Sequence, residues 1–389
     1  MSATKPHTST EVVDVKGSSG SHSRIGEIAS RLASKLSGSR QRHPVLHRLL
    51  LTVLVVCLGL VLTGLVSGVT NLDLATGVAM SVAILGLSFL TGFSGQVSLG
   101  NGAFFGVGAY VFAIWGNHQS SSIGEDLLVC TAAGAVAGLI VGLPATRLRG
   151  PYLAGMTIAV AIAFGSLIDE FSSWTNGDQG LNVQSPVTPP AWLASFIGEP
   201  TSSLRATFMW RADITIVVAG ITFFLMANLF RSRKGRAMRL MRENEVAAEL
   251  VGVSLPGARV SAFVVSAALA GLGGGLTTLV STAVYGSTFT LGLSIEMLTL
   301  LVIGGIGTLS GSLIAGLLYA YSITWISLLV SGLGLTSSSN LGSQMNNIIF
   351  GAVLIITVLV APLGIAGTTQ FVISRRLARR RTERLDKAG

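Results

Sequence analysis

Ten apolar runs, separated by polar segments, make up about half of this 389-residue chain. An α-helix needs about 20 mostly apolar residues to cross the hydrocarbon core of a bilayer, and a helix satisfies its own backbone there. The runs therefore predict an all-α, polytopic integral membrane protein with about ten transmembrane helices. They lie at 49–69, 74–92, 101–116, 126–146, 151–168, 213–230, 259–281, 294–309, 311–331 and 346–366. The runs at 101–116 and 294–309 are short and interrupted by glycine, so we expect broken or re-entrant segments there.

The composition agrees with a membrane protein. Charged residues make up 11% of the chain, whereas soluble domains average about 25%. The 48 glycines predict closely packed helices, because small residues let two helix backbones approach each other in lipid. Cys57 and Cys130 lie within apolar runs and give neither a disulfide framework nor metal-ligand spacing.

The basic residues predict the orientation of the chain. Eight of the 26 Lys and Arg residues lie before residue 49, seven lie from 231 to 259, and seven follow residue 374. This clustering is the positive-inside pattern of a membrane protein and does not indicate a nucleic-acid site, despite the net charge of +9. With ten spans, both termini face the cytosol. We expect a multi-pass protein of a bacterial cytoplasmic (inner) membrane.

The same topology divides the chain into parts. Residues 1–45 are polar and without apolar period, which predicts a disordered cytosolic extension. Residues 46–367 form the transmembrane domain, with an external loop at 170–212 and a charged cytosolic segment at 231–258. Residues 368–389 form a basic cytosolic tail, which either touches anionic lipid or only anchors the topology.

A polar, glycine-rich break, TGFSGQVSLGNGAFFGVGAY, covers residues 91–110. Irregular backbone at membrane depth survives only inside protein or beside a water-filled cavity, so one interpretation is a broken element that lines a translocation path. The other is a polar turn at the cytosolic surface, followed by close helix packing through Gly102 and Gly106. The candidate path residues are Ser94, Gly95, Gln96, Ser98, Gly100 and Asn101.

A second glycine run, IGGIGTLSG, covers residues 303–311. It differs from a nucleotide-binding loop because Ser310 stands where the third glycine would be and both flanks are apolar spans. Close helix packing or a backbone hinge beside the path explains it better. Gly304, Gly305 and Gly307 join the candidate path residues on this basis.

The external loop carries the stretch WTNGDQGL at residues 174–181. Its Asn-Gly and Gly-Asp pairs suit tight turns. The loop is long for a connection without function, so it is either an ordinary solvated loop or a docking site for an external protein. The docking candidates are Thr175, Gly177, Asp178 and Gly180.

Several kinds of chemistry are disfavoured by what the sequence lacks. No lysine follows the Gly-x-x-x-x-Gly of a phosphate-binding loop, so we expect a transport subunit without an ATPase site, a cofactor or a metal of its own. Acidic and basic residues lie only near the ends of the apolar runs, which disfavours a proton relay. Glu296 lies about two residues from the outer end of its run, where its side chain is expected to snorkel to the surface.

A dense charged island, RKGRAMRLMRENEVAAELVG, covers residues 233–252. If residues 235–251 form one helix, arginines load its N-terminal half and glutamates its C-terminal half, the reverse of what a helix dipole favours. Such a pattern suits docking to a partner better than isolated helix stability. The candidate coupling residues are Arg236, Arg239, Arg242, Glu243, Glu245, Ala247, Ala248 and Gly252, the last as a helix stop.

The end of this island resembles a known signature. Glu245, Ala247, Ala248 and Gly252 are similar to the Glu-Ala-Ala-x-x-x-Gly motif of ABC-importer membrane subunits, with one residue inserted after the glutamate. Residues 235–252 as a whole resemble the corresponding segment of branched-chain amino acid ABC transporter permeases of the LivM type. Further segments that match in order are 91–110, 149–152, 175–181, 262–271 and 296–311, so that the resemblance covers roughly residues 73–366.

The resemblance implies a permease that pairs with a second, related permease, two ATPase subunits and an external substrate-binding protein. ATP and Mg would bind to the ATPase partners, and the charged island would transmit their movement. The expected substrates are branched-chain or other hydrophobic amino acids. Two alternatives stay open: a permease for urea or short amides within the same family, or a stand-alone ion-coupled carrier or channel.

Overall fold

The computed structural model describes residues 44–65, 68–118, 122–148, 150–183, 189 and 203–332. The tenth apolar run, the predicted basic tail and all but the last two residues of the predicted N-terminal extension lie outside these residues. The chain divides into two units at Leu51 and Thr52, and the first unit is described only where its first helix begins at Pro44. The packing described below is that of the second unit.

Nine of the ten apolar runs coincide with a helix. Among the described residues, six helices are long and apolar enough to cross a membrane: α2 (Pro44–Leu65), α3 (Gly68–Ser94), α5 (Ile123–Ala145), α6 (Pro151–Glu170), α9 (Leu204–Arg231) and α12 (Leu255–Ser281). The remaining apolar helices are α4 (Asn101–His118), α13 (Leu291–Gly304) and α14 (Leu309–Gly332). The prediction of an all-α polytopic membrane protein is confirmed, whereas the count of ten spans rests on a run outside the described residues.

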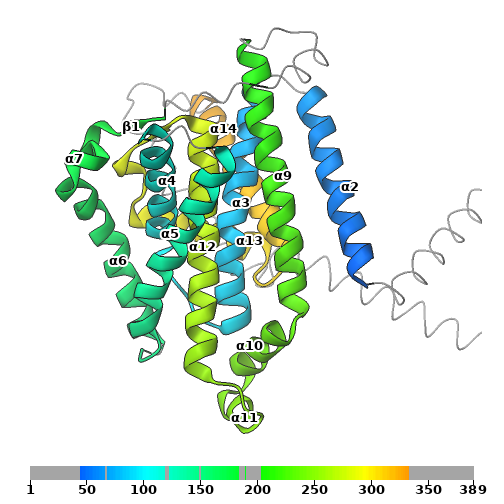
Figure 1. Cartoon of the computed structure of the whole chain (residues 1–389), viewed down its shortest axis with the longest axis vertical. Coiled ribbons are helices and arrows are strands. Elements are labelled where there is room, and N and C mark those ends of the chain that lie inside the picture. Colours follow the sequence, from blue (N-terminus) through cyan, green and yellow to red (C-terminus); the bar gives the residue numbers. More distant parts are fainter. Residues whose placement is uncertain are drawn as a thin grey trace, which may run out of the picture. The chain divides into compact units, whose positions relative to one another are not determined.

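Short elements join these helices at the two ends of the bundle (Figure 1). At one end, α10 (Arg233–Glu243) and α11 (Glu245–Leu250) connect α9 to α12. At the opposite end lie α7 (Ser172–Thr175) and the 3-10 helices η1 (Gly177–Gln179) and η2 (Gly286–Thr288). There β1 (Leu181–Asn182) pairs antiparallel with β2 (Ala283–Val284), which ties the segment after α6 to the end of α12.

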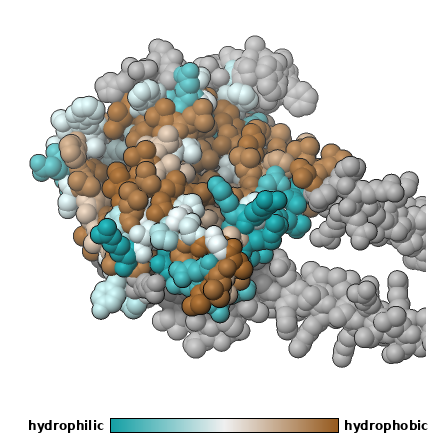
Figure 2. Space-filling view, turned by 60° about the horizontal axis from the view of Figure 1, so that its bottom comes forward, coloured by the Kyte–Doolittle hydropathy of each residue, from teal (hydrophilic) through white to brown (hydrophobic). Residues whose placement is uncertain are grey.

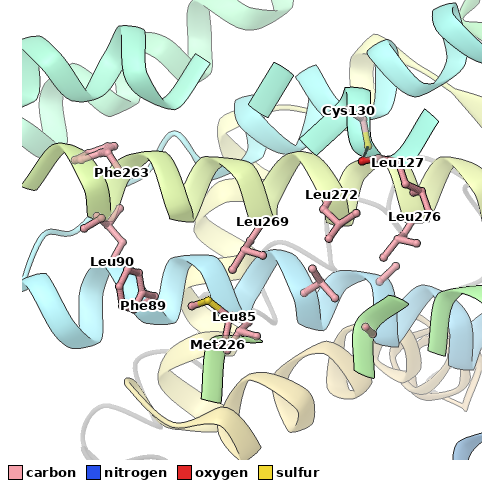
Figure 3. Close-up of a cluster of buried hydrophobic side chains, with 14 of the residues drawn as sticks. Leu85, Phe89, Leu90, Leu127, Cys130, Met226, Phe263, Leu269, Leu272 and Leu276 are labelled. Atoms are coloured by element: carbon pink, nitrogen blue, oxygen red, sulfur yellow. Dashed lines mark hydrogen bonds between the residues drawn. The ribbon is translucent and has the colours of Figure 1, made fainter. Parts of the chain in front are cut away.

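Two helices, α3 and α12, form the centre of the packing. Every residue of α3 from Gly77 to Ser94 is buried, and α12 packs against α3, α4 and α5. Figure 3 shows Leu90 of α3 facing Phe263 of α12 and Leu85 of α3 beside Met226 of α9, with Leu127 and Cys130 of α5 near Leu276 of α12. Because lipid tails are as apolar as these side chains, close van der Waals packing has to stabilise the bundle in the membrane.

Glycines make that close packing possible. Gly134, Gly138 and Gly142 follow one another at intervals of one helical turn on α5, and all three face α12. On α4, Gly108 lies so close to Gly271 of α12 that a Cβ atom would overlap the Gly271 carbonyl. The prediction of glycine-mediated helix packing is confirmed.

The structure moves two acidic residues deeper than the sequence placed them. Helix α9 begins at Leu204, so Asp213 lies well inside the helix, and its Oδ1 accepts a 2.8 Å hydrogen bond from the Thr63 hydroxyl of α2. Helix α13 begins at Leu291, so Glu296 lies five residues inside it and is half-buried. The expectation that acidic residues lie only near span ends is wrong for Asp213, because polar residues extend the helix beyond the apolar run.

Candidate functional site

The charged island forms two helices rather than one. Helix α10 ends at Glu243 and α11 begins at Glu245, with an extended Asn244 between them. The Asn244 side chain caps α11 by accepting a 3.0 Å hydrogen bond from the Ala247 N–H. Arg242 now lies in the last turn of α10 and Glu245 in the first turn of α11, and both positions suit the helix dipoles. The single helix with reversed charge order is therefore wrong, because the chain restarts at Asn244.

The end of α11 confirms the predicted helix stop. Gly252 has a positive φ of 83°, and the Val253 N–H donates to the Ala248 carbonyl at 3.0 Å, as in a Schellman motif. Ala248 is fully buried, whereas Val246 and Leu250 are exposed, Leu250 at 84%. Figure 2 brings this end of the molecule forward and shows hydrophilic residues gathered beside broad apolar surface. Helix α11 thus presents apolar side chains at a polar end of the bundle.

Helix α10 is attached to the end of α3. The Arg242 guanidinium donates a 2.5 Å hydrogen bond to the Gly92 carbonyl, and the Arg239 guanidinium carbon lies 4.2 Å from the centre of the Phe93 ring. The Phe93 ring also packs against Phe230 of α9, with the ring centres 4.2 Å apart. Two predicted coupling arginines therefore contact the start of the predicted glycine-rich break.

Helix α11 is attached to the start of α12 by an ion pair. The Arg259 guanidinium lies 2.5 Å from a carboxylate oxygen of Glu245 and 3.3 Å from the Thr146 carbonyl at the end of α5. Arg259 is 8% exposed, so Glu245 neutralises a nearly buried cation. The structure places this predicted coupling residue in an internal contact that joins α11 to α5 and α12.

The second glycine run meets the first at the end of α3. Helix α13 ends at Gly304, and Gly305 and Gly307 both have positive φ in the turn that leads to α14. The Gly307 N–H donates to the Ser88 hydroxyl at 3.0 Å, and a Cβ on Gly92 would lie 2.5 Å from the Gly307 Cα. Helix α10, the end of α3 and the turn between α13 and α14 are therefore joined by direct contacts.

The rest of the break is an irregular segment at residues 95–100 between α3 and α4. Gln96, Ser98 and Gly100 are buried, whereas Gly95 and Val97 are exposed. Beyond the segment, Gly102 packs against Ser294 of α13. The segment thus combines a feature of a broken, path-lining element, namely irregular backbone partly inside the protein, with a feature of a surface turn followed by close helix packing, namely the contact of Gly102.

The predicted path residues in this segment differ in their contacts. The Ser94 hydroxyl donates to the Leu90 carbonyl of its own helix, and the Ser98 hydroxyl accepts from the Gly100 N–H. In contrast, Gln96 Oε1 and Asn101 Oδ1 are buried acceptors without a hydrogen-bond partner in the described part of the chain. These two amides are the candidates for contact with a transported molecule.

The segment after α6, which the sequence predicts to be external, forms an ordered turn. The Thr175 hydroxyl donates to the Ile168 carbonyl at 2.7 Å and accepts from the Gly177 N–H at 3.2 Å. Gly180 has a positive φ and packs against the Val284 carbonyl. Asp178 lies in η1 between these glycines. Thr175 and the two glycines shape the turn, whereas Trp174, 70% exposed, is available for contact.

Sequence reasoning missed three residues that the structure brings to these sites. From the sequence, Arg259 is only one of the basic residues that set topology, and nothing marks Ser294 or Gly92 individually. Arg259 lies four residues inside α12, where an unpaired arginine costs free energy. Its position inside a predicted span is therefore the sequence feature that indicates a paired, functionally relevant arginine. No signal in a single sequence indicates that Gly92 meets Gly307. Within the described ranges, no group of His, Cys, Asp and Glu side chains could hold a metal ion.

Comparisons with known proteins give one family. The family model for the permease component of the branched-chain amino acid transport system matches residues 69–358. The high-affinity branched-chain amino acid transport system permease proteins LivM of Salmonella typhimurium and Escherichia coli are each 30% identical over 271 residues, which cover 65% of this chain and 62% of theirs. LivH of Escherichia coli is 25% identical over 305 residues, covering 75% of this chain and 92% of its own. No solved structure matches the chain.

Proposed function

The chain belongs to the family of branched-chain amino acid transport system permease components, and we propose that it is a membrane-spanning permease subunit of an ABC importer. It would form the translocation path for branched-chain or other hydrophobic amino acids across a bacterial inner membrane. Its partners would be a second, related permease, two ATPases that bind ATP and Mg, and an external substrate-binding protein. Since the chain spans 62% of the length of the LivM relatives, substrate and partners are part of this proposal.

The observation that carries the proposal is the attachment of α10 and α11 to the membrane helices. A short helix with exposed apolar side chains, such as Val246 and Leu250, is suited to insertion into a groove on a partner protein. The Glu245–Arg259 ion pair joins that helix to α12, and the Arg242–Gly92 hydrogen bond joins its neighbour to α3. A push on α11 would thus move two central helices together.

The turn between α13 and α14 would transmit the movement of α3 to α13 and so change which side of the membrane the translocation path is open to. Gly307 contacts Gly92 on α3, and its positive φ gives the turn a conformation that non-glycine residues rarely adopt. Alternating access requires one packed element to move against another around a binding site. Helix α13, short and bounded by glycine, is the element best placed for that movement.

Reconstitution tests the proposal. Proteoliposomes are prepared from this chain, its paired permease and the ATPases. They should take up radiolabelled leucine only when two conditions hold: ATP is present on the side of the membrane that carries the ATPases, and the binding protein is present on the opposite side. The purified chain alone should not transport leucine. Transport by the chain alone, without ATP, would instead support the stand-alone carrier or channel, and uptake of urea but not leucine would support the amide permease.

The external turn gives a further expected result. Replacing Trp174 by alanine should raise the concentration of binding protein needed for half-maximal uptake about tenfold, since exposed aromatic side chains contribute strongly to protein interfaces. ATP hydrolysis measured without the binding protein should not change. Trp115, which is also exposed, provides the matched control, and Trp115→Ala should leave the half-maximal concentration unaltered. An unchanged concentration in Trp174→Ala would assign Trp174 to membrane anchoring.

A further inference from the structure

Two short helices begin beside each other inside the bundle. Helix α4 has 18 residues and α13 has 14, both fewer than the roughly 20 that a complete span requires. The Gly102 N–H, in the first turn of α4, donates a 2.9 Å hydrogen bond to the Ser294 hydroxyl, in the first turn of α13. The Leu99 N–H, just before α4, donates to the Thr157 hydroxyl. Thr157 lies six residues after the start of α6, which is about 9 Å along the helix axis. The two helix starts therefore meet within the protein.

A buried amide lies between these helix starts. Asn101 is the first residue of α4 and is 1% exposed, and its Nδ2 lies 3.4 Å from the Met297 sulfur, one turn along α13 from Ser294. Its Oδ1 has no hydrogen-bond partner among the residues that the structure describes. Leaving a buried carbonyl oxygen unpaired costs about 1–3 kcal/mol. A bound molecule that donates a hydrogen bond to this oxygen would remove that cost.

The helix starts supply the opposite chemistry. The first N–H groups of a helix carry a partial positive charge and bind anions, including carboxylates. In transport proteins with interrupted helices, such ends can hold the anionic group of a substrate near the middle of the membrane. Anion-binding N–H groups and an unpaired amide acceptor thus lie within one turn of each other, without any Lys, Arg, Asp or Glu in the first turn of α4 or α13.

We infer that the starts of α4 and α13 form the subsite for the charged groups of a transported α-amino acid. The substrate carboxylate accepts from the Gly102 N–H, which exchanges the Ser294 hydroxyl for a carboxylate oxygen, and from the first N–H groups of α13, whose start has no side-chain cap. The substrate ammonium donates to Asn101 Oδ1. This inference rests on the proposed function for the nature of the substrate, and it assigns residues to the recognition of its zwitterionic part.

The subsite is closed in this structure, because Asn101, Ser294 and Met297 are all buried. Opening it requires α13 to move away from α4. The far end of α13 is the glycine turn whose Gly307 contacts Gly92 on α3, beside the attachment of α10. The same contacts that would receive the push from the ATPases thus lead to the helix that closes the subsite.

Replacing Asn101 by aspartate tests the assignment. An acidic residue in the first turn of α4 suits the helix dipole, which offsets part of the cost of burying the new carboxylate, and this carboxylate would repel that of the substrate. We expect leucine uptake by the complete transporter to fall about tenfold. We also expect the preference to invert: the wild-type transporter, without its binding protein, should bind radiolabelled leucine better than leucinamide, and Asn101→Asp should bind leucinamide better. A purely structural role for Asn101 would not produce that inversion.

Two further variants separate the effect of charge from the loss of the Asn101 acceptor. Asn117→Asp places the same charge change at the exposed far end of α4; it removes the 2.8 Å hydrogen bond that Asn117 donates to the Asn182 carbonyl but leaves the subsite intact, so leucine should still be preferred to leucinamide. Asn101→Ala removes the acceptor without adding charge and should weaken leucine binding several-fold; it decides the matter if Asn101→Asp does not assemble. Wild-type binding and preference in Asn101→Ala would overturn the subsite while leaving the proposed function intact. Failure of the wild-type complex to transport any amino acid would overturn the proposed function instead.

Discussion

Replacing Gly108 by alanine is expected to lower the free energy of unfolding by about 3 kcal/mol, at the upper end of the cost of overpacking. A Cβ at this position of α4 would overlap the carbonyl oxygen and Cα of Gly271 on α12. Backbone atoms cannot rotate away as a flexible side chain would, so the two helices must separate. Because α12 also packs against α3 and α5, the separation would disturb the centre of the bundle. Thermal unfolding of the purified protein in detergent measures the effect.

Gly155 provides a matched control for this prediction. It lies within α6, and no atom lies within 4 Å of the Cβ that alanine would add there. Gly155→Ala should be neutral or stabilise the protein by up to about 1 kcal/mol, through helix propensity alone. If the two variants unfold at the same temperature, α4 and α12 do not pack through Gly108 in the folded protein. The comparison separates the loss of a close contact from the general effect of replacing a glycine in a helix.

The membrane architecture could be predicted from the sequence because hydrophobicity is a property of single segments. Nine apolar runs coincide with helices whose ends lie within six residues of those expected, apart from α9, which begins at Leu204 rather than 213. A hydropathy pattern marks where a chain contacts lipid or apolar protein, but a helix continues as far as its backbone is hydrogen-bonded and its residues allow. That difference explains why Asp213 and Glu296 lie deeper than expected.

The arrangement of the site could be predicted only in part. The charged island and both glycine runs were identifiable from composition, and Gly252 from its place after a helix. That Arg242 reaches Gly92, and that Gly92 meets Gly307, are contacts between segments 150 and 215 residues apart. Such contacts depend on how helices pack, which the periodicity of one segment does not contain. The restart at Asn244 was open to prediction, since Asn is a preferred N-cap residue and Glu245 follows it.

Reversing the charge of Glu245 should reduce ATP-driven leucine uptake to the level seen without ATP. Glu245→Arg would place two guanidinium groups together at the start of α12, where Arg259 is nearly buried. A pair of this partly buried kind contributes about 1–3 kcal/mol, between the values for exposed and buried ion pairs. With repulsion in its place, α11 would detach from α12 and could not transmit movement. Uptake in proteoliposomes and thermal unfolding measure the two consequences.

Exchange of the two charges distinguishes an internal tether from direct contact with an ATPase. If Glu245 acts through Arg259, the double variant Glu245→Arg/Arg259→Glu restores the ion pair and should recover uptake to within about threefold of wild type, a strong positive coupling between the two substitutions. Recovery would be incomplete because a glutamate at 259 cannot donate to the Thr146 carbonyl. If Glu245 instead contacts a basic residue of the ATPase, the double variant should remain as inactive as Glu245→Arg. Glu249→Arg, an exposed reversal on the same helix, should leave the unfolding temperature unchanged, because Glu249 takes no part in the ion pair to Arg259.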